Sequence, residues 1–412
     1  MRSLLTIIDF RKDFALKLIA WLLVLSSITG GILLPQPFYF FAIGLLGIMI
    51  IAKGRIRFSN YLVLLLLIVC LISLVFNRPP AYFRVWSRLA VYSLVVLVVS
   101  PMFYSEYAVV MRFRVLLFFL YIGTLLSVGS FFAYFLGINL FERQGEILDI
   151  SAGSFSGLMN HSMVLGPISA LSSILLFSLI LNSKRCRIKI SRMVILIILM
   201  LFCCGACLLS ASRIALVGLV VGLLMVVIVV YREQLSKAFK IVFLVLALGG
   251  ASYPIWGKLA EYVIQKNEGN IVRGSIFYSR EDKFEARIYE FKSNPVIGIG
   301  FCVSDPQFTG VNESNGRVEP GSSWLAVASM TGILGLLVFL PLCFVASKRV
   351  WKIQDPLASS ILTGTLFFLY VHMIAEGYIY APKSCFSLLF WLVMSSIYGF
   401  TIMEKKKEVT TV

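Results

Sequence analysis

The residues best suited to chemistry in this sequence are a few arginines that lie between long apolar runs. Arg213 stands where two apolar runs meet almost without a loop, and Arg280 and Arg287 lie in a polar stretch further along the chain. A guanidinium is permanently charged and offers a planar fork of N–H donors that matches phosphate oxygens. In an apolar segment such a group is costly and usually faces a cavity, a partner or a polar substrate. These arginines indicate a site for a phosphate-bearing substrate.

Structural roles also account for these arginines. The sequence does not decide between a structural role and substrate binding. Arg213 is also typical of an arginine that snorkels at a helix end or pairs with nearby serines such as Ser212. Arg287 could form a salt bridge with Glu290 or Glu285. Both interpretations predict a charged side chain in an apolar setting, so the residue pattern does not separate them.

Two residues are candidates for a general base. Transfer of a group to a hydroxyl needs a base, or at least a hydrogen-bond acceptor, within reach. Glu319 and His161 lie near the ends of apolar runs and could serve, although a surface carboxylate and an interhelical histidine are the plainer interpretations. Glu376 and Lys383 flank the last turn and predict either a structural ion pair or a contact to the acceptor molecule.

The elements that must position these residues are membrane-spanning helices. Of 412 residues, 59% are hydrophobic and only 14% are charged, which excludes a soluble globular protein. A bilayer core needs about 20 apolar residues per helix. Twelve runs of that kind predict an all-α, polytopic integral membrane protein: 15–34, 36–52, 60–76, 89–104, 115–137, 158–182, 193–211, 214–231, 241–257, 323–346, 357–377 and 384–403.

The distribution of Lys and Arg predicts the orientation of these helices. With the N-terminus inside, 23 of the 37 cations fall in inner segments and 14 in outer ones. Eight of the outer cations belong to one long loop, and long loops cross the membrane largely regardless of charge. Both termini are therefore predicted to be cytoplasmic. The net charge of +17 follows from topology and does not indicate nucleic acid as a partner.

The long outer loop, residues 258–322, divides the chain between the ninth and tenth spans. It separates predicted helices 1–9 (residues 1–257) from helices 10–12 and a cytoplasmic tail (residues 323–412). A loop of this size without secondary structure is unusual, and the apolar spacing of residues 279–293 predicts a helix within it. Residues 294–300, with Pro295 and two glycines, end that helix in an irregular turn.

Motifs for cofactors are not found. The chain contains no GxxxxGK[ST] phosphate-binding loop, which argues against an ATP-driven pump. Cys203, Cys204 and Cys207 lie in an apolar run without a histidine or carboxylate nearby, so packing explains them better than metal binding. Only His161 and His372 are present, which excludes a histidine-rich metal site. The sequence predicts neither a metal nor another cofactor.

Three segments, in order and at fitting spacing, resemble the O-antigen ligase and polymerase superfamily. They are Ser210–Gly218 with its S-x-S-R start, Arg287–Gly300 with its R…P-hydrophobic-x-G-x-G pattern, and Gly321–Gly335, which leads into the next helix. An earlier segment, Gly157–Gly166, is similar to the family's asparagine-containing entry to a mid-chain helix. The resemblance covers about residues 150–340.

The resemblance implies an integral-membrane enzyme that transfers glycans from a polyprenyl-pyrophosphate donor on the outer face, without a nucleotide. Arg213, Arg287 and Arg280 would bind the pyrophosphate, and Glu319 or His161 would act on the acceptor hydroxyl. Supporting or acceptor contacts would come from Ser212, Glu376 and Lys383. An acceptor glycan and the lipid bilayer are the implied partners, and whether a chain-length regulator binds is left open.

One departure from the family pattern favours one of its two activities over the other. Ligases of the family carry a histidine at the head of the third segment, where this chain has Gly321. The resemblance therefore favours a polymerase of O-antigen, capsule or exopolysaccharide in the bacterial inner membrane. A ligase that moves glycan onto lipid A core is the nearest alternative, and a flippase for lipid-linked oligosaccharides is the alternative of another class.

Overall fold

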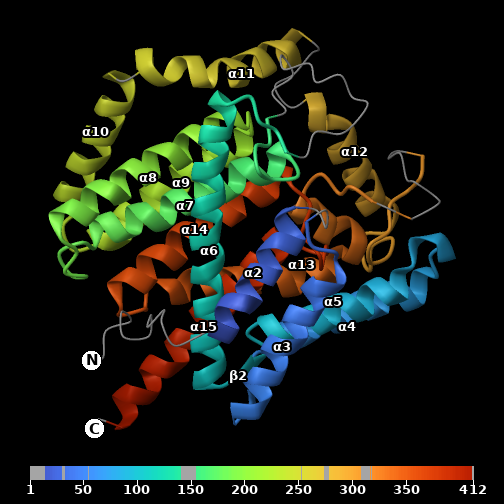
Figure 1. Cartoon of the computed structure of the whole chain (residues 1–412). Coiled ribbons are helices and arrows are strands. Elements are labelled where there is room, and N and C mark those ends of the chain that lie inside the picture. Colours follow the sequence, from blue (N-terminus) through green and yellow to red (C-terminus); the bar gives the residue numbers. More distant parts are fainter. Residues whose placement is uncertain are drawn as a thin grey trace. The chain divides into compact units, whose positions relative to one another are not determined.

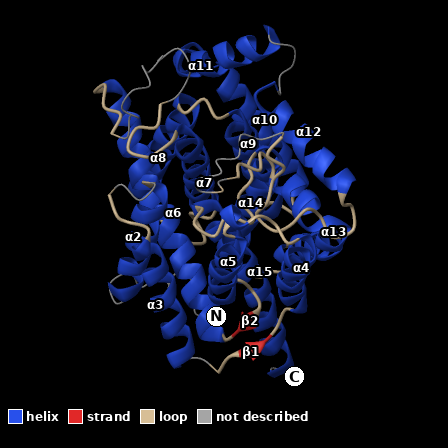
Figure 2. Ribbon diagram, turned by 90° about the vertical axis from the view of Figure 1, so that its right-hand side faces the viewer, coloured by secondary structure: helices blue, strands red, loops and turns tan. Residues whose placement is uncertain are grey.

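Helices make up 77% of the part of the chain that the structure describes. The computed structural model describes residues 14–29, 33–53, 55–140, 155–251, 253–272, 278–307, 316 and 318–410. In these ranges the strands are β1 and β2, which form one short antiparallel pair with Arg57 opposite Tyr104 (Figure 2). Helices satisfy their own backbone hydrogen bonds, which apolar surroundings demand.

The helices and strands follow the apolar runs of the sequence (Figure 1). Their bounds are α2 Phe14–Ile28, α3 Pro37–Lys53, β1 Arg57–Phe58, α4 Tyr61–Asn77, the 3-10 helix η1 Ala81–Phe83, α5 Val85–Val99, β2 Phe103–Tyr104, α6 Glu106–Phe135, α7 Ser162–Leu181, α8 Ile190–Leu209, α9 Arg213–Val230, α10 Leu235–Ala251, α11 Tyr253–Val272, α12 Tyr278–Ser293, α13 Ser323–Val350, α14 Pro356–Ala375 and α15 Cys385–Thr410.

The predicted class, an all-α polytopic membrane protein, is confirmed. Among the described residues, eight helical segments are long and apolar enough to cross a membrane: 81–99, 106–135, 162–181, 190–209, 213–230, 323–350, 356–375 and 385–406. The apolar helices α2, α3 and α4 are shorter. The count of twelve spans stays a prediction. The orientation also stays a prediction. Some of the cations counted for it lie outside the described residues: Arg2, Arg11, Lys12, Arg143, Arg273 and Arg317.

The predicted ninth run, residues 241–257, is divided between two helices. Helix α10 ends at Ala251, and α11 begins at Tyr253 and continues to Val272, well into the predicted outer loop. Pro254 stands in the first turn of α11, where the missing N–H of a proline costs no helical hydrogen bond. The helix predicted over residues 279–293 is present as α12, Tyr278–Ser293.

The chain forms two compact units. The first comprises Met1–Tyr39, Arg114–Val272 and Val350–Val371. In it α7 packs against both α8 and α9, side by side (Figure 1). Glycines permit this close packing: a Cβ on Gly222 of α9 would lie 2.4 Å from Ile174 of α7 and 3.1 Å from the backbone oxygen of Gly364 of α14.

The second unit comprises Phe40–Phe113, Arg273–Arg349 and His372–Val412, and its centre is a break in α13. Gly332 has φ 65° and ψ −161°, which interrupts the helix and frees backbone groups from their helical partners. The turn 295–300 fills the break. Ile299 N–H donates to Ser329 O (2.9 Å), and Ile333 N–H donates to Pro295 O (2.8 Å).

The C-terminal end of α4 holds the same turn from another side. Asn77 Nδ2 donates to Gly298 O (2.8 Å), and Asn294 Nδ2 donates to Asn77 Oδ1 (3.0 Å). Ser73 Oγ, one helical turn earlier, donates to Met330 O (2.7 Å) next to the break. The turn and the interrupted helix therefore form one hydrogen-bonded structure, which we call the α13 interlock.

We predict that Gly332→Ala destabilises the protein by about 1–3 kcal/mol. An added Cβ would lie 2.3 Å from Val296 O, and a φ near +65° disfavours any residue with a Cβ. The thermal unfolding midpoint of the purified protein in detergent measures the effect. Gly44→Ala in α3 is the matched control, because nothing lies within 4 Å of its added Cβ. Equal midpoints for the two variants would contradict the close approach.

Candidate active site

Helix α12 carries a cluster of charges that is partly open to solvent. Arg280 lies between two carboxylates: its Nη1 is 3.3 Å from Glu319 Oε1, and its Nη2 pairs with Glu376. Lys283, one turn further along α12, pairs with the same oxygen of Glu319. The Arg280 side chain is 14% exposed, whereas that of Glu319 is 63% exposed. We call Arg280, Lys283, Glu319 and Glu376 the α12 charge cluster.

Glycines bring the three segments of this cluster together. Gly321 has φ 73°, and a Cβ on it would lie 2.7 Å from Lys283 Cβ, so the chain before α13 rests directly on α12. A Cβ on Gly377 would lie 2.5 Å from Pro320 Cβ, so the connection after α14 rests on that chain in turn. Both contacts place Glu319 and Glu376 beside the cations of α12.

Two serines at the start of α13 fix the connection between α14 and α15. Ser323 Oγ donates to Glu376 O (2.7 Å) and accepts from the backbone N–H of Tyr378 (2.9 Å). Ser322 Oγ donates to Met373 O (3.2 Å). The backbone of Glu376 is thus held by hydrogen bonds while its carboxylate faces Arg280.

Arg287 forms a buried ion pair with Glu290 on the same helix. Its Nη1 lies 2.9 Å from Glu290 Oε2, and the two side chains are 0% and 1% exposed. The same guanidinium donates to Ser329 Oγ (3.2 Å) and Ser304 Oγ. Burial lowers the pKa of Arg287 and Glu290 opposes this shift, but an arginine stays charged at neutral pH. Arg287 thus forms the ion pair with Glu290 that the sequence left open, and its predicted contact to pyrophosphate stays a prediction.

Glu290 and Arg287 together anchor the chain that follows the glycine turn. Glu290 Oε1 accepts from Ser304 Oγ (2.8 Å) and from Asp305 N–H (2.9 Å). Burial along α12 does not follow the polarity of the side chains: the apolar Ile288 is 44% exposed, whereas the charged Glu290 is buried. The ion pair explains why Glu290 is buried, since a buried arginine retains a carboxylate beside it.

Cys302, next to this anchor, is poorly suited to act as a nucleophile. Burial raises the pKa of its thiol to about 12, although the nearby Arg88 and Arg287 lower it. Its Sγ lies 3.4 Å from Tyr380 O. Burial also raises the pKa of Tyr380 well above its usual value. Both groups are therefore neutral at physiological pH and contribute packing. Among the described residues, no group of three His, Cys, Asp or Glu is placed to hold a metal ion.

In the first unit, the S-x-S-R segment forms the tight turn between α8 and α9. Ser210 Oγ donates to Cys207 O (2.7 Å) and accepts from Ser212 N–H (3.3 Å), and Ala211 between them has φ 51°. Ser212 is the N-cap residue of α9, and Arg213 is its first residue. Arg213 Nη1 donates to Asn267 Oδ1 of α11 (2.9 Å). The arginine is half-buried, and its contact to Asn267 joins two helices of this unit.

His161 caps the N-terminus of α7 in the same unit. Its Nδ1 accepts a hydrogen bond from Met163 N–H (3.0 Å), and the side chain is exposed. A neutral imidazole with Nδ1 as acceptor carries its proton on Nε2. One turn on, a Cβ on Gly166 would lie 2.5 Å from Ser210 Oγ, so α7 packs on the S-x-S-R turn.

The structure brings together some of the residues predicted from the sequence. Arg280, Glu319 and Glu376 share one cluster, and Arg287 lies buried on the same helix. Lys383 Nζ lies 5.8 Å from the centroid of the Phe40 ring. The sequence analysis missed Lys283, although its place one turn after Arg280 was a usable signal. The roles of all predicted site residues stay predictions.

Comparison with known proteins supports the family. Residues 195–340 match the family model described as O-Antigen ligase. The match includes the S-x-S-R turn, α12, the turn 295–300 and the first half of α13, and it confirms the resemblance to the O-antigen ligase and polymerase superfamily. The search of curated proteins gives no match.

Fold and match together define the class of this protein. It is a polytopic α-helical membrane protein in which residues 195–340 are similar to the O-antigen ligase family. Members of that family transfer glycans, so the domain supports a membrane-embedded glycan-processing function.

We predict that removing either partner of the buried ion pair costs about 3–5 kcal/mol, because the other charge is left uncompensated. Arg287→Met and Glu290→Leu should each lower the thermal unfolding midpoint in detergent. The double variant should recover much of the loss, since it buries no charge. A double variant as unstable as the sum of the single ones would contradict the coupling.

Proposed function

We propose that this protein is a polysaccharide polymerase that transfers polyprenyl-pyrophosphate-linked repeat units to a growing glycan, such as O-antigen, capsule or exopolysaccharide. The donor is an oligosaccharide whose anomeric carbon is already activated by pyrophosphate, so the reaction needs no nucleotide. The observation that carries the proposal is the α12 charge cluster, in which Arg280 and Lys283 converge on the exposed Glu319, all three within the matched residues 195–340.

The cluster supplies the two functions that glycan transfer requires. The acceptor hydroxyl oxygen attacks the anomeric carbon, the bond from that carbon to the pyrophosphate oxygen breaks, and the electron pair leaves with the pyrophosphate. Arg280 and Lys283 stabilise the negative charge that builds on this leaving group. Glu319 accepts the proton of the attacking hydroxyl. Its 63% exposure leaves the carboxylate accessible to an acceptor sugar.

The burial and contacts of the other predicted site residues indicate which role each could have in the reaction. Arg287 has no exposed surface and braces Ser304 and Ser329, so we assign it a positioning role for the loop that follows the glycine turn. Arg213 is half-buried at the start of α9 in the first unit, with Ser212 beside it, and we keep the pyrophosphate role that the sequence predicts for it. His161 is less well placed than Glu319 to accept the proton, because its Nδ1 lone pair caps α7.

Gly321 favours a polymerase over a ligase. The family's ligases carry a histidine at the position that resembles Gly321. In this chain a Cβ there would meet Lys283 at 2.7 Å, and the backbone is left-handed. The site therefore has no room for an imidazole in that place without a rearrangement of α12. Transfer to lipid A core remains the second activity to be tested.

The proposed location is the bacterial inner membrane, with both termini in the cytoplasm and the α12 charge cluster outside. This orientation rests on the excess of Lys and Arg in the short inner segments. A flippase of similar topology would need a polar path through the membrane midplane. The four residues of the α12 charge cluster instead gather on α12, before α13 and after α14, which fits surface chemistry better than transport.

The test is an assay of purified protein with lipid-linked repeat units and no nucleotide. Extension of the glycan supports the polymerase, transfer to a lipid A core acceptor would replace it by the ligase, and the absence of both would favour transport. Arg280→Gln should lower the rate by about 10²- to 10³-fold, because one donor to the leaving group is lost. Lys292→Gln, an exposed cation on the same helix, is the matched control.

Glu319→Gln should lower the rate of extension by about 10²- to 10⁴-fold, because the amide cannot accept the proton. The same variant should lose the acid limb of the pH–rate profile, which a structural role for Glu319 would not remove. Glu285→Gln, an exposed carboxylate on α12, should behave like the wild type. An unchanged acid limb in Glu319→Gln would exclude it as the base.

A further inference from the structure

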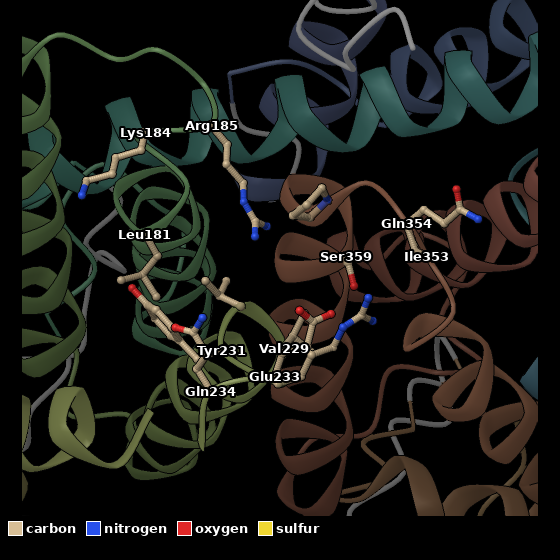
Figure 3. A pocket seen from close by; sticks show the side chains of 13 residues that line it. Leu181, Lys184, Arg185, Val229, Tyr231, Glu233, Gln234, Ile353, Gln354 and Ser359 are labelled. Atoms are coloured by element: carbon tan, nitrogen blue, oxygen red, sulfur yellow. The ribbon is translucent and has the colours of Figure 1, made fainter. Parts of the chain in front are cut away.

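The first unit contains a cavity that plays no part in the proposed reaction. Its volume is about 290 Å³, and it lies among three chain segments: the loop after α7, the loop after α9 and the chain before α14 (Figure 3). A single water needs about 15 Å³ by this measure, so the cavity has room for a polar head group rather than one ion.

The cavity has a basic polar side and an apolar side. Lys184, Arg185 and Arg232 contribute cations, and Glu233 is the one carboxylate among the lining residues, which leaves two formal positive charges in excess. The apolar part of the lining comes from Leu181, Val229, Val230, Ile353 and Pro356. A lining with cations beside aliphatic side chains suits an amphiphile with an anionic head group.

Arg185 is the cation best placed to reach a ligand. Figure 3 shows its side chain extending into the cavity, whereas the amine of Lys184 turns away. Within the ranges that the structure describes, neither residue has a carboxylate at salt-bridge distance. Burial raises the pKa of Cys186, the carboxylate of Asp355 raises it further, and Arg185 lowers it. Asp355 Oδ1 accepts a hydrogen bond from the backbone N–H of Ala358, so this carboxylate caps α14.

Arg232 completes the basic side from the loop after α9. Its Nη1 donates to Trp351 O (2.9 Å), which fixes the guanidinium against the chain before α14. A guanidinium has five N–H donors in a planar fork, so donors remain for a phosphate oxygen. Arg185 and Arg232 thus approach the cavity from two different loops.

All three segments around the cavity are predicted to be cytoplasmic by the distribution of cations. Basic pockets between membrane helices on that side bind the head groups of anionic lipids. Topology alone explains an excess of Lys and Arg in these loops, but it does not require them to surround a cavity with an aliphatic wall.

We propose that this cavity binds a phosphate-bearing anion at the inner membrane surface, with Arg185 and Arg232 as its ligands. An anionic phospholipid would place its phosphate between the arginines and its chains beside the half-buried Leu181, Val230 and Pro356. A free phosphate compound has the same anionic chemistry without the chains. The site is separate from the α12 charge cluster in sequence and belongs to the other unit.

The experiment measures lipid binding and thermal stability of the full chain in a neutral detergent. Phosphatidylglycerol should raise the unfolding midpoint more than phosphatidylcholine does. Inorganic phosphate tests whether an anion without acyl chains has the same effect. Arg185→Gln and Arg232→Gln should each weaken phosphatidylglycerol binding about five-fold, as expected for the loss of one cation near an anionic head group.

Arg192→Gln is the matched control, because Arg192 is an exposed cation of the same predicted inner segment and does not line the cavity. Stabilisation by phosphatidylglycerol that depends on Arg185 and Arg232 but not on Arg192 supports a lipid site. The same dependence with inorganic phosphate alone supports the anion site with a soluble ligand. Equal losses in all three variants, or no stabilisation by either ligand, would overturn the proposal.

Discussion

The second unit depends on one constraint, which is that backbone groups buried in apolar surroundings need hydrogen-bond partners. The break in α13 at Gly332 frees such groups, and the turn 295–300 supplies their partners through Ile299 and Pro295. Irregular backbone is tolerated at membrane depth only where other protein groups surround it. The α13 interlock therefore decides where α12 ends and where the chain toward α13 begins.

This constraint gives a physical meaning to two of the sequence segments that resemble the family. The R…P-hydrophobic-x-G-x-G segment forms the turn, and the segment from Gly321 to Gly335 forms the helix that the turn interrupts. Gly298 and Gly332 lie within the interlock, where an added Cβ would meet backbone at 2.3–2.4 Å. These glycines are structural, and the chemistry that we propose lies beside them on α12.

Burial separates the arginines that the sequence presents as equivalent. Arg287 is enclosed with Glu290, and its hydrogen bonds to serines hold the chain together. Arg280 keeps 14% of its side chain exposed between two carboxylates, so an anionic substrate can compete for it. Arg287 therefore has a structural role, whereas Arg280, one and a half to two helical turns away, is a candidate substrate contact.

The sequence by itself determined the class of fold and the resemblance to the family, because apolar runs of bilayer length and ordered short motifs are local properties of the chain. It also placed α12 to within a residue, since helical periodicity is local. Only the tertiary structure decided that Glu290 is buried while Ile288 is exposed, and that Glu319 meets Lys283 across 36 positions. Such pairings depend on which segments pack together, and no local pattern encodes that.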